Sequence, residues 1–179
     1  MWDITTADFR DTYKGSRKIP IRNTMAKMET RTPQGTHTVV VALRDKQSLE
    51  SLMDLAFRMA KTMEASIVAI HVVEVPVTLD LSAESNELDS AGRAVLEEAR
   101  EKAQGSFGTI SIELIRARHA GRAIVDEATQ HCADLLVLGY CHKNPISEVL
   151  LGSTAQYVMR HAPCRVIVEV PAPVQATSM

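Results

Sequence analysis

The sequence predicts an α/β fold in which helices cover both faces of a parallel sheet. Between about residues 38 and 170, short β-branched apolar runs alternate with helical patterns in the order β-α-β-α-β-α-β-α-β. Aromatic residues make up only 4% of the 179 residues, so the core must consist of Val, Leu, Ile, Ala and Met. This length is enough for one domain with a core on each side of the sheet. We therefore expect one such domain, connected by right-handed crossovers.

The first elements are two buried strands with a helix between them. Residues 38–43 form a short apolar, β-branched run that is typical of a buried parallel strand. Residues 49–63 carry apolar side chains at spacings of three and four, which predicts a helix with one inward face, and Ser48 is its expected N-cap. Residues 66–73 predict the second strand, and a polar loop that contains Pro76 follows it.

The second half of the domain continues the same alternation. Its first strand alternates apolar and polar residues, which favours a position near a sheet edge, and its second strand is the most apolar of all. Gly105 is the expected C-terminal cap of the helix that precedes them. The expected elements are a helix over 88–104, a strand over 109–116, a helix over 120–132, a strand over 134–139, a helix over 152–161 and a strand over 164–170.

The two ends of the chain lie outside the predicted domain, which we bound at residues 37–171. Residues 1–36 contain Pro, Gly and scattered Thr without sustained periodicity, so we expect an extended or partly disordered N-terminal arm. Residues 172–179 are expected to form a C-terminal tail. The start of the chain is polar and lacks the apolar segment of a signal peptide.

Composition argues against several classes of function. The net charge of −2 and the few aromatic residues give no case for nucleic-acid binding. No apolar run approaches the roughly 18 residues that span a bilayer, so no membrane insertion is expected. The three cysteines show no regular spacing, which favours reduced thiols and a cytoplasmic location.

The most informative segment runs from Gly139 to Thr154. In parallel sheets, ligands bind beyond the C-terminal ends of the strands, where the strand order reverses. Gly139 ends the fourth predicted strand, and Gly152, Ser153 and Thr154 open a helix, where free N–H groups, hydroxyls and the positive helix end favour an anion. From spacing alone, an equally good interpretation is that Gly139 only turns the chain and Ser153 only caps the helix.

Two stretches near the end of the chain resemble the universal stress protein family. They are residues 133–139 (ADLLVLG) and 150–168 (LLGSTAQYVMRHAPCRVIV), and the resemblance extends over 38–170. Residues 71–76 (HVVEVP) are similar to stress-protein domains that accompany amino acid permeases and related transporters. The resemblance implies a Rossmann-like fold of the adenine nucleotide alpha hydrolase type, with a five-stranded parallel sheet in the order 3-2-1-4-5.

The resemblance also implies partners and a ligand. Homodimers of this family commonly form through the fifth strand, here Arg165 to Val170, and a transporter is a candidate partner. The ligand would be ATP or a related adenine nucleotide, with Mg²⁺. The residues implied for its binding are Ala42, Leu43, Arg44, Asp45, Val72, Val73, Gly139, His142, Gly152, Ser153 and Thr154.

Two positions depart from the family pattern. After the fourth strand, ATP-binding members carry Gly, two residues, Gly, nine residues, Gly and then Ser or Thr, and this chain has His142 in place of the second Gly. They usually place an Asp directly after the first strand, where this chain has Arg44 followed by Asp45. Two interpretations stay open: a nucleotide-binding regulatory module, in which Arg44 and Lys46 face phosphates, and a dimeric interaction or scaffold domain with a degenerate pocket.

No enzymatic or metal site is predicted. No general base and no nucleophile elbow accompany the loop, so at most very slow ATP hydrolysis is expected. His131-Cys132 and Cys141-His142 match no zinc spacing. His71, near the end of the second strand, is expected to be a structural histidine.

Overall fold

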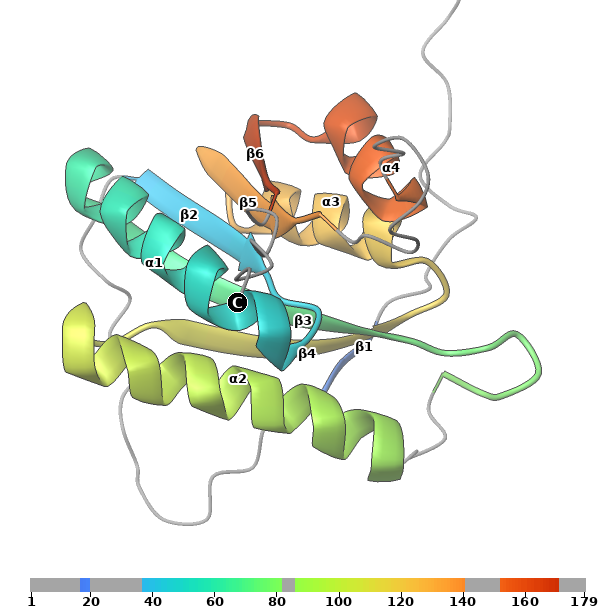
Figure 1. Cartoon of the computed structure of the whole chain (residues 1–179). Helices are drawn as coiled ribbons and strands as arrows, with labels where there is room; N and C mark the ends of the chain where they lie inside the picture. Colours follow the sequence, from blue (N-terminus) through green and yellow to red (C-terminus); the bar gives the residue numbers. More distant parts are fainter. Residues whose placement is uncertain (1–16, 20–36, 82–85, 141–151, 171–179) are drawn as a thin grey trace, which may run out of the picture.

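The structure is a computed structural model that describes residues 17–19, 37–81, 86–140 and 152–170. Its centre is a sheet of parallel strands (Figure 1). The parallel strands are β2 (His37–Ala42), β3 (Ala65–Glu74), β4 (Ser111–Ala117), β5 (Leu135–Gly139) and β6 (Arg165–Glu169). They lie in the order β4-β3-β2-β5-β6, which confirms the predicted order 3-2-1-4-5.

One further strand lies at the edge of this sheet. β1 (Arg17–Ile19) pairs with β4 in the antiparallel direction, with Lys18 opposite Ile115. The sequence predicted no element in the N-terminal arm, because three residues are too few to show a period. In the described part of the chain the sheet therefore has six strands, and β4 is the edge of its parallel part only.

Two helices pack on each face of the sheet. They are α1 (Lys46–Met63), α2 (Asn86–Ser106), α3 (Ala120–Gln130) and α4 (Ser153–His161). Figure 1 shows α1 beside α2 and α3 beside α4. Successive residues of β2 alternate between the two cores, since Val39 and Val41 pack with α1 and α2 while Val40 packs with α3 and α4. This two-sided burial explains the continuous apolar runs of the central strands.

The ends of the two longer helices differ from the sequence predictions. Asp45, not Ser48, is the N-cap of α1: its backbone is extended, and its Oδ1 accepts hydrogen bonds from the Ser48 backbone N–H at 3.1 Å and from the Ser48 hydroxyl at 2.9 Å. Gly105 lies inside α2, and Gly108, at φ +118°, follows it in a conformation that favours glycine. The Gly108 N–H donates to the Ala103 carbonyl at 2.7 Å.

A buried ion pair joins α2 to β4. The Arg116 side chain, only 2% exposed, donates from Nε and Nη2 to the two carboxylate oxygens of Asp89, at 3.0 and 2.6 Å. A third contact, 3.3 Å long, runs from Nη1 of Arg116 to the Leu81 carbonyl. This bidentate pair fixes the position of α2 against the sheet near the C-terminal end of β4.

Among the described residues, none of the helices has both the length and the apolar character that a bilayer span requires.

Candidate functional site

The strand order reverses between β2 and β5, and a ligand crevice is expected beyond the C-terminal ends of these two strands. The two strands are parallel neighbours, with Ala42 opposite Leu138 at their C-terminal ends. The chain leaves β2 through α1 toward β3, and it leaves β5 through α4 toward β6, on the other side. The two connections therefore run in opposite directions from the β2–β5 pair, and the strand order reverses between these strands. Parallel α/β sheets bind ligands at such a point.

The loop after β2 contributes backbone and two charged side chains to this edge. Leu43 is 2% exposed, and its N–H donates to the Ile70 carbonyl at 2.8 Å, which continues the sheet one residue beyond Ala42. Arg44 is 64% exposed at its side chain, and its Nε lies 3.9 Å from Oδ2 of Asp45. Arg44 is therefore available to an anion at this edge, held only by a weak surface pair.

Asp45 and Lys46 have local partners. One carboxylate oxygen of Asp45 accepts both hydrogen bonds of the α1 cap, so this side chain is committed to the helix. Nζ of Lys46 lies 2.7 Å from Oε2 of Glu98 on α2, which turns the Lys46 side chain away from β5. Of the two cations predicted to face a phosphate, Arg44 has the freer side chain.

β3 extends past the end of β2 on the other side of this loop. Ile70 is the last β3 residue paired with β2, so His71, Val72 and Val73 form an overhang beside the Leu43–Asp45 loop. Val73 is buried against the core under α1 and α2, and Val72 packs partly against the opposite core. Their backbone is the part of the overhang that a ligand could contact.

His71 fixes the end of β2. Its Nδ1 lies 3.0 Å from the Leu43 carbonyl, which can only accept, so Nδ1 carries the proton. Burial lowers the pKa of His71, against smaller opposing effects of this hydrogen bond and of Asp45, and the ring is neutral at pH 7. These contacts agree with the predicted structural histidine.

Gly139 lies where α1 approaches β5 most closely. A Cβ built on Gly139 would lie 3.2 Å from Cδ1 of Leu52 and 3.7 Å from Cβ of Ser48. A side chain at position 139 would therefore press on Leu52 of α1, so close packing of this helix favours glycine here. The next residue, Tyr140, is buried and donates its N–H to the Glu169 carbonyl at 2.7 Å. His142 lies outside the described residues.

The N-terminus of α4 lies at the same edge of the sheet. Its N-cap, Gly152, has no side chain to accept from the first-turn N–H groups, and its φ of −58° is accessible to any residue. A Cβ on Gly152 would meet no described atom within 4 Å. Ser153 is exposed and Thr154 is partly exposed. Among the described residues, no side chain caps the first turn of α4, which carries N–H groups and two hydroxyls.

Two side chains that the sequence analysis did not single out shape the loop after β3. Arg118 donates to the carbonyls of Val75, Pro76 and Leu79, the last at 2.8 Å. Oε1 of Glu74 accepts the Ala120 N–H at 2.8 Å and so caps the start of α3. The sequence could have pointed to them only through their positions. Glu74 is the last residue of β3, and Arg118 directly follows β4, at the edge of the sheet where ligands bind.

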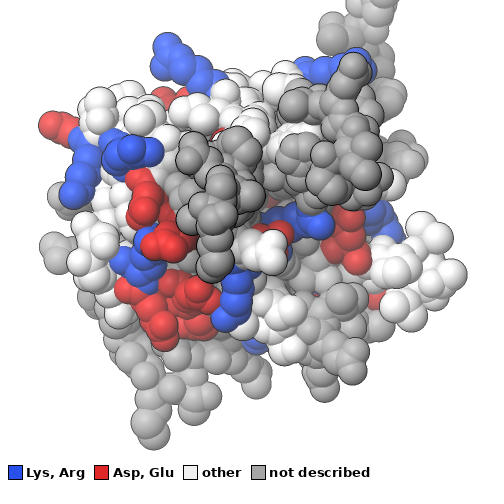
Figure 2. All heavy atoms as spheres, in the orientation of Figure 1, with Lys and Arg blue, Asp and Glu red and all other residues white. Residues whose placement is uncertain are grey.

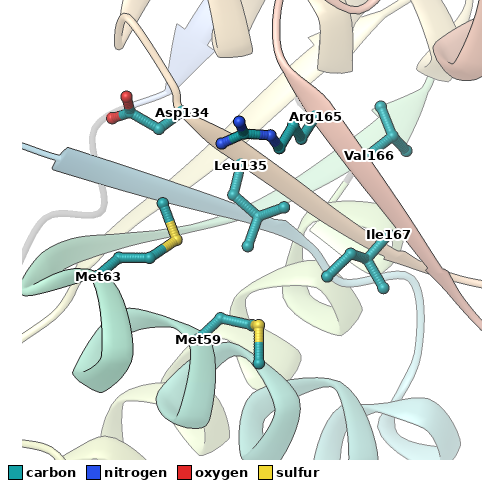
Figure 3. Close-up of a pocket in the computed structure, with 7 residues that line it drawn as sticks. All are labelled: Met59, Met63, Asp134, Leu135, Arg165, Val166 and Ile167. Carbon is teal, nitrogen blue, oxygen red and sulfur yellow. The ribbon is translucent and has the colours of Figure 1, made fainter.

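A separate hollow lies away from the crevice, where β5 and β6 begin. Figure 3 shows Met59 and Met63 of α1 directed toward this hollow, with Arg165 extending toward Asp134. Its lining is Met59, Met63, Asp134, Leu135, Arg165, Val166 and Ile167. The hollow is mainly apolar and adjoins β6, the strand implied for dimerisation.

Acidic and basic side chains are mixed on the face that α1 and α2 present. Figure 2 shows them side by side in the view of Figure 1. Lys102 of α2 lies 3.0 Å from Asp54 and 3.7 Å from Glu50 of α1, and Arg100 pairs with Glu97 at 2.6 Å. Among the described residues of this face, the basic side chains lie beside acidic ones, so they form no purely basic patch that would attract a polyanion.

The sequence is similar to that of known proteins. Residues 35–171 match the sequence model of the Universal stress protein family. A universal stress protein of Methanocaldococcus jannaschii is 33% identical over 119 residues, which are 63% of this chain and 69% of that protein.

Solved structures share the fold. The universal stress protein UspA from Lactobacillus plantarum aligns with a TM-score of 0.58 at 26% identity, over 75% of this chain and 97% of that one. The universal stress protein from Archaeoglobus fulgidus in complex with dAMP aligns with a TM-score of 0.60 at 19% identity, over 74% and 96% of the two chains. Two further structures with this fold are a universal stress protein in complex with cAMP and an Arabidopsis thaliana family protein with AMP bound.

Proposed function

The chain belongs to the universal stress protein family, and from this premise we propose that it binds an adenine nucleotide in the crevice between β2 and β5. Three solved proteins of the same fold carry dAMP, cAMP or AMP, as their descriptions state. The ligand class is common to all three. For this chain we propose ATP, with Mg²⁺, as the working ligand.

One observation carries the proposal: the ends of β2 and β5 and the uncapped start of α4 lie at one edge of the sheet. The overhang of β3 offers the backbone of Val72 and Val73 to an adenine base. Gly152, Ser153 and Thr154 offer N–H groups, hydroxyls and the positive helix end to phosphates. The exposed guanidinium of Arg44 would add a charge-assisted contact to a phosphate oxygen.

The role that fits this site is regulatory binding rather than turnover. Among the described residues at this edge, the carboxylate closest in sequence to the end of β2 is Asp45; its Oδ1 caps α1 and its Oδ2 lies 3.9 Å from Nε of Arg44. A base that activates water needs a free acceptor within hydrogen-bond reach of it. We therefore assign the nucleotide to a signal that changes partner affinity, in a stress response or in the regulation of a transporter.

The partner surface that we propose is β6. In the described part of the chain, β6 pairs with β5 on one side only, and the apolar hollow of Figure 3 adjoins it. A second copy of the chain would cover both the strand and the hollow. This is the homodimer expected from residues Arg165 to Val170.

A second function has a specific observation in its favour. Where ATP-binding relatives are expected to have an Asp after the first strand, this chain has Arg44, and the neighbouring Asp45 is used by α1. A chain that lost nucleotide affinity would retain the dimer and act as an interaction or scaffold domain. The two functions differ in one measurable property, the affinity for nucleotide.

Equilibrium dialysis of the full chain against ATP, AMP and GTP, each with and without Mg²⁺, tests the nucleotide. We expect saturable binding of the adenine nucleotides and weaker binding of GTP. Gly152→Val should abolish it, because the added side chain would occupy the phosphate position. The fold should tolerate this change, since φ is ordinary and no described atom lies within 4 Å.

Gly105→Val is the matched control, because a Cβ at Gly105, which lies in α2, also meets no described atom within 4 Å. It should bind nucleotide like the parent chain. An absence of binding by the parent chain at millimolar nucleotide would reject the proposal and favour the scaffold function. Equal binding by both glycine variants would place the nucleotide elsewhere.

A further inference from the structure

Three side chains with metal-ligating atoms meet at the edge of the sheet opposite the crevice. Glu113 lies near the start of β4, Glu127 lies in the last turns of α3, and His131 is the C-cap residue of α3. Parallel strands begin at the edge opposite the one where their ligand-binding loops lie, so this cluster is separate from the nucleotide crevice. Of the three, only His131 was considered in the sequence analysis, in a His-Cys set whose spacing matches no zinc site, and neither glutamate was considered as a ligand.

The atoms converge on one point. Nε2 of His131 lies 3.1 Å from Oε1 of Glu113 and 3.6 Å from Oε2 of Glu127, and the three ligand atoms all lie within 4.8 Å of one another. A cation held tetrahedrally at 2.0–2.2 Å from each ligand separates its ligand atoms by about 3.3–3.6 Å. The observed separations of the ring nitrogen from both carboxylates are close to that value.

The surroundings suit a partly open site. Glu127 is 4% exposed, while the side chains of Glu113 and His131 are each 23% exposed, so a solvent molecule can reach the cluster from one side. Nε2 of His131 is buried, and its contacts with the carboxylates do not have hydrogen-bond geometry. Glu127 and His131 are four residues apart, the spacing that brings two ligands to one face of a helix.

The chemistry of the three ligand atoms favours one class of metal ion. Two carboxylate oxygens and one imidazole nitrogen suit Zn²⁺ and the neighbouring first-row divalent ions, whereas Ca²⁺ and Mg²⁺ prefer oxygen alone. A divalent ion would balance the two carboxylates with His131 neutral.

We propose that Glu113, Glu127 and His131 form a binding site for Zn²⁺ or a similar first-row divalent ion, with solvent as the fourth ligand. The ion would join the start of β4 to the end of α3. It would thus couple metal occupancy to the stability of the face that α3 and α4 cover, independently of the nucleotide.

Calorimetric titration of the metal-free full chain with Zn²⁺, in the absence of nucleotide, tests the site. We expect one ion per chain at this cluster and a rise in melting temperature on binding. His131→Gln and Glu113→Gln should each weaken binding by more than about tenfold, since even groups that only orient a metal ligand contribute about that factor. Glu113 is chosen for substitution because it is partly exposed. The other glutamate, Glu127, is buried, and a change there could prevent folding.

Two controls separate this site from simpler ones. His161→Gln removes an exposed histidine in the last turn of α4 and should leave affinity unchanged. Cys132→Ser removes the exposed thiol that directly follows His131 and should also leave it unchanged. The proposal is overturned if Zn²⁺ does not bind, if both cluster variants bind like the parent chain, or if only Cys132→Ser loses affinity; the cluster would then be an ion pair.

Discussion

At the scale of single residues, Asp45 illustrates how position in a loop does not determine the role of a side chain. The sequence left Asp45 as a substitute for a nucleotide-binding carboxylate, and the structure shows it holding the first turn of α1. Ser48, predicted as the cap, is instead the residue that the cap binds. Both residue types cap helices well, so the sequence alone could not choose between two starts three residues apart.

The capping role of Asp45 can be tested by substitution. Asp45→Ala should lower the free energy of unfolding by about 1 kcal/mol, because the Ser48 N–H loses its acceptor. Asp45→Asn retains an acceptor oxygen and should remain within a few tenths of a kcal/mol of the parent chain. Urea denaturation of both variants measures the difference, and equal stabilities of the two would show that the cap contributes nothing.

His71 predicts a pH dependence. Burial lowers its pKa in the folded state, so the unfolded chain binds the proton more readily. The resulting stability is fully present above the ordinary histidine pKa of about 6.5 and is lost as pH falls from there toward the lower folded-state pKa. The parent chain should therefore become less stable across this interval.

His71→Asn tests that dependence, because an amide N–H can replace Nδ1 as donor to the Leu43 carbonyl and does not titrate. Urea midpoints measured from about pH 8 to pH 5 should fall less steeply than in the parent chain. His161→Gln, at an exposed histidine, should keep the parent slope. An unchanged slope in His71→Asn would assign the pH dependence to other groups.

At the scale of helices and strands, the parallel sheet was predictable because each of its strands has an apolar run that packs against the two cores, fully in β2, β3 and β5 and only partly in β6. The alternation with amphipathic helices predicted parallel strands joined by right-handed crossovers, and the strand order 3-2-1-4-5 followed from the resemblance to the universal stress protein family. β1 was not predictable, since it is held by backbone pairing with β4 and three residues carry no pattern. The end of α2 was placed at Gly105 rather than near Gly108 because both are glycines and only the backbone angle separates them.

The candidate site was predictable in location but not in contacts. Strand order alone directs attention to the ends of β2 and β5. The engagement of Lys46 by Glu98 and the packing of Leu52 on Gly139 depend on how α1 and α2 meet the sheet, which no local pattern encodes. The cluster of Glu113 with Glu127 and His131 was missed for the same reason, because its members come from two separate elements.

The buried pair between β4 and α2 predicts strong coupling. Asp89→Asn should destabilise the chain by about 3–5 kcal/mol, because it removes the charge of the carboxylate that Nε and Nη2 of the buried Arg116 side chain contact. Replacing both residues, as Asp89→Leu with Arg116→Met, should cost less than the sum of the two single changes. Denaturation of the four chains in a double-mutant cycle measures this, and additive effects would contradict it.

At the scale of the whole molecule, the proposed dimer predicts a response to charge on β6. Ile167 is half-buried and lines the hollow beside this strand. Ile167→Lys should shift the chain from dimer to monomer in sedimentation velocity, because a second copy would have to bury the new charge. Met159→Lys, at an exposed apolar residue of α4, is the control and should sediment like the parent chain.

Circular dichroism of both lysine variants would establish that each retains the fold. A parent chain that sediments as a monomer would reject the dimer. Dimers of unchanged affinity in Ile167→Lys would move the interface away from β6.

The short pairing of β1 with β4 has a consequence for how many copies can associate. A sheet with two open edges can recruit copies at both sides and grow into a fibre. Here β1 pairs with Leu114–Arg116 of β4 and forms an edge strand of three residues, so in the described part of the chain β6, with five residues, is the longer edge strand. Edge-to-edge joining across a two-fold axis then consumes that edge in both copies and terminates. The three residues Arg17–Ile19 would thus act as a stop that limits polymerisation.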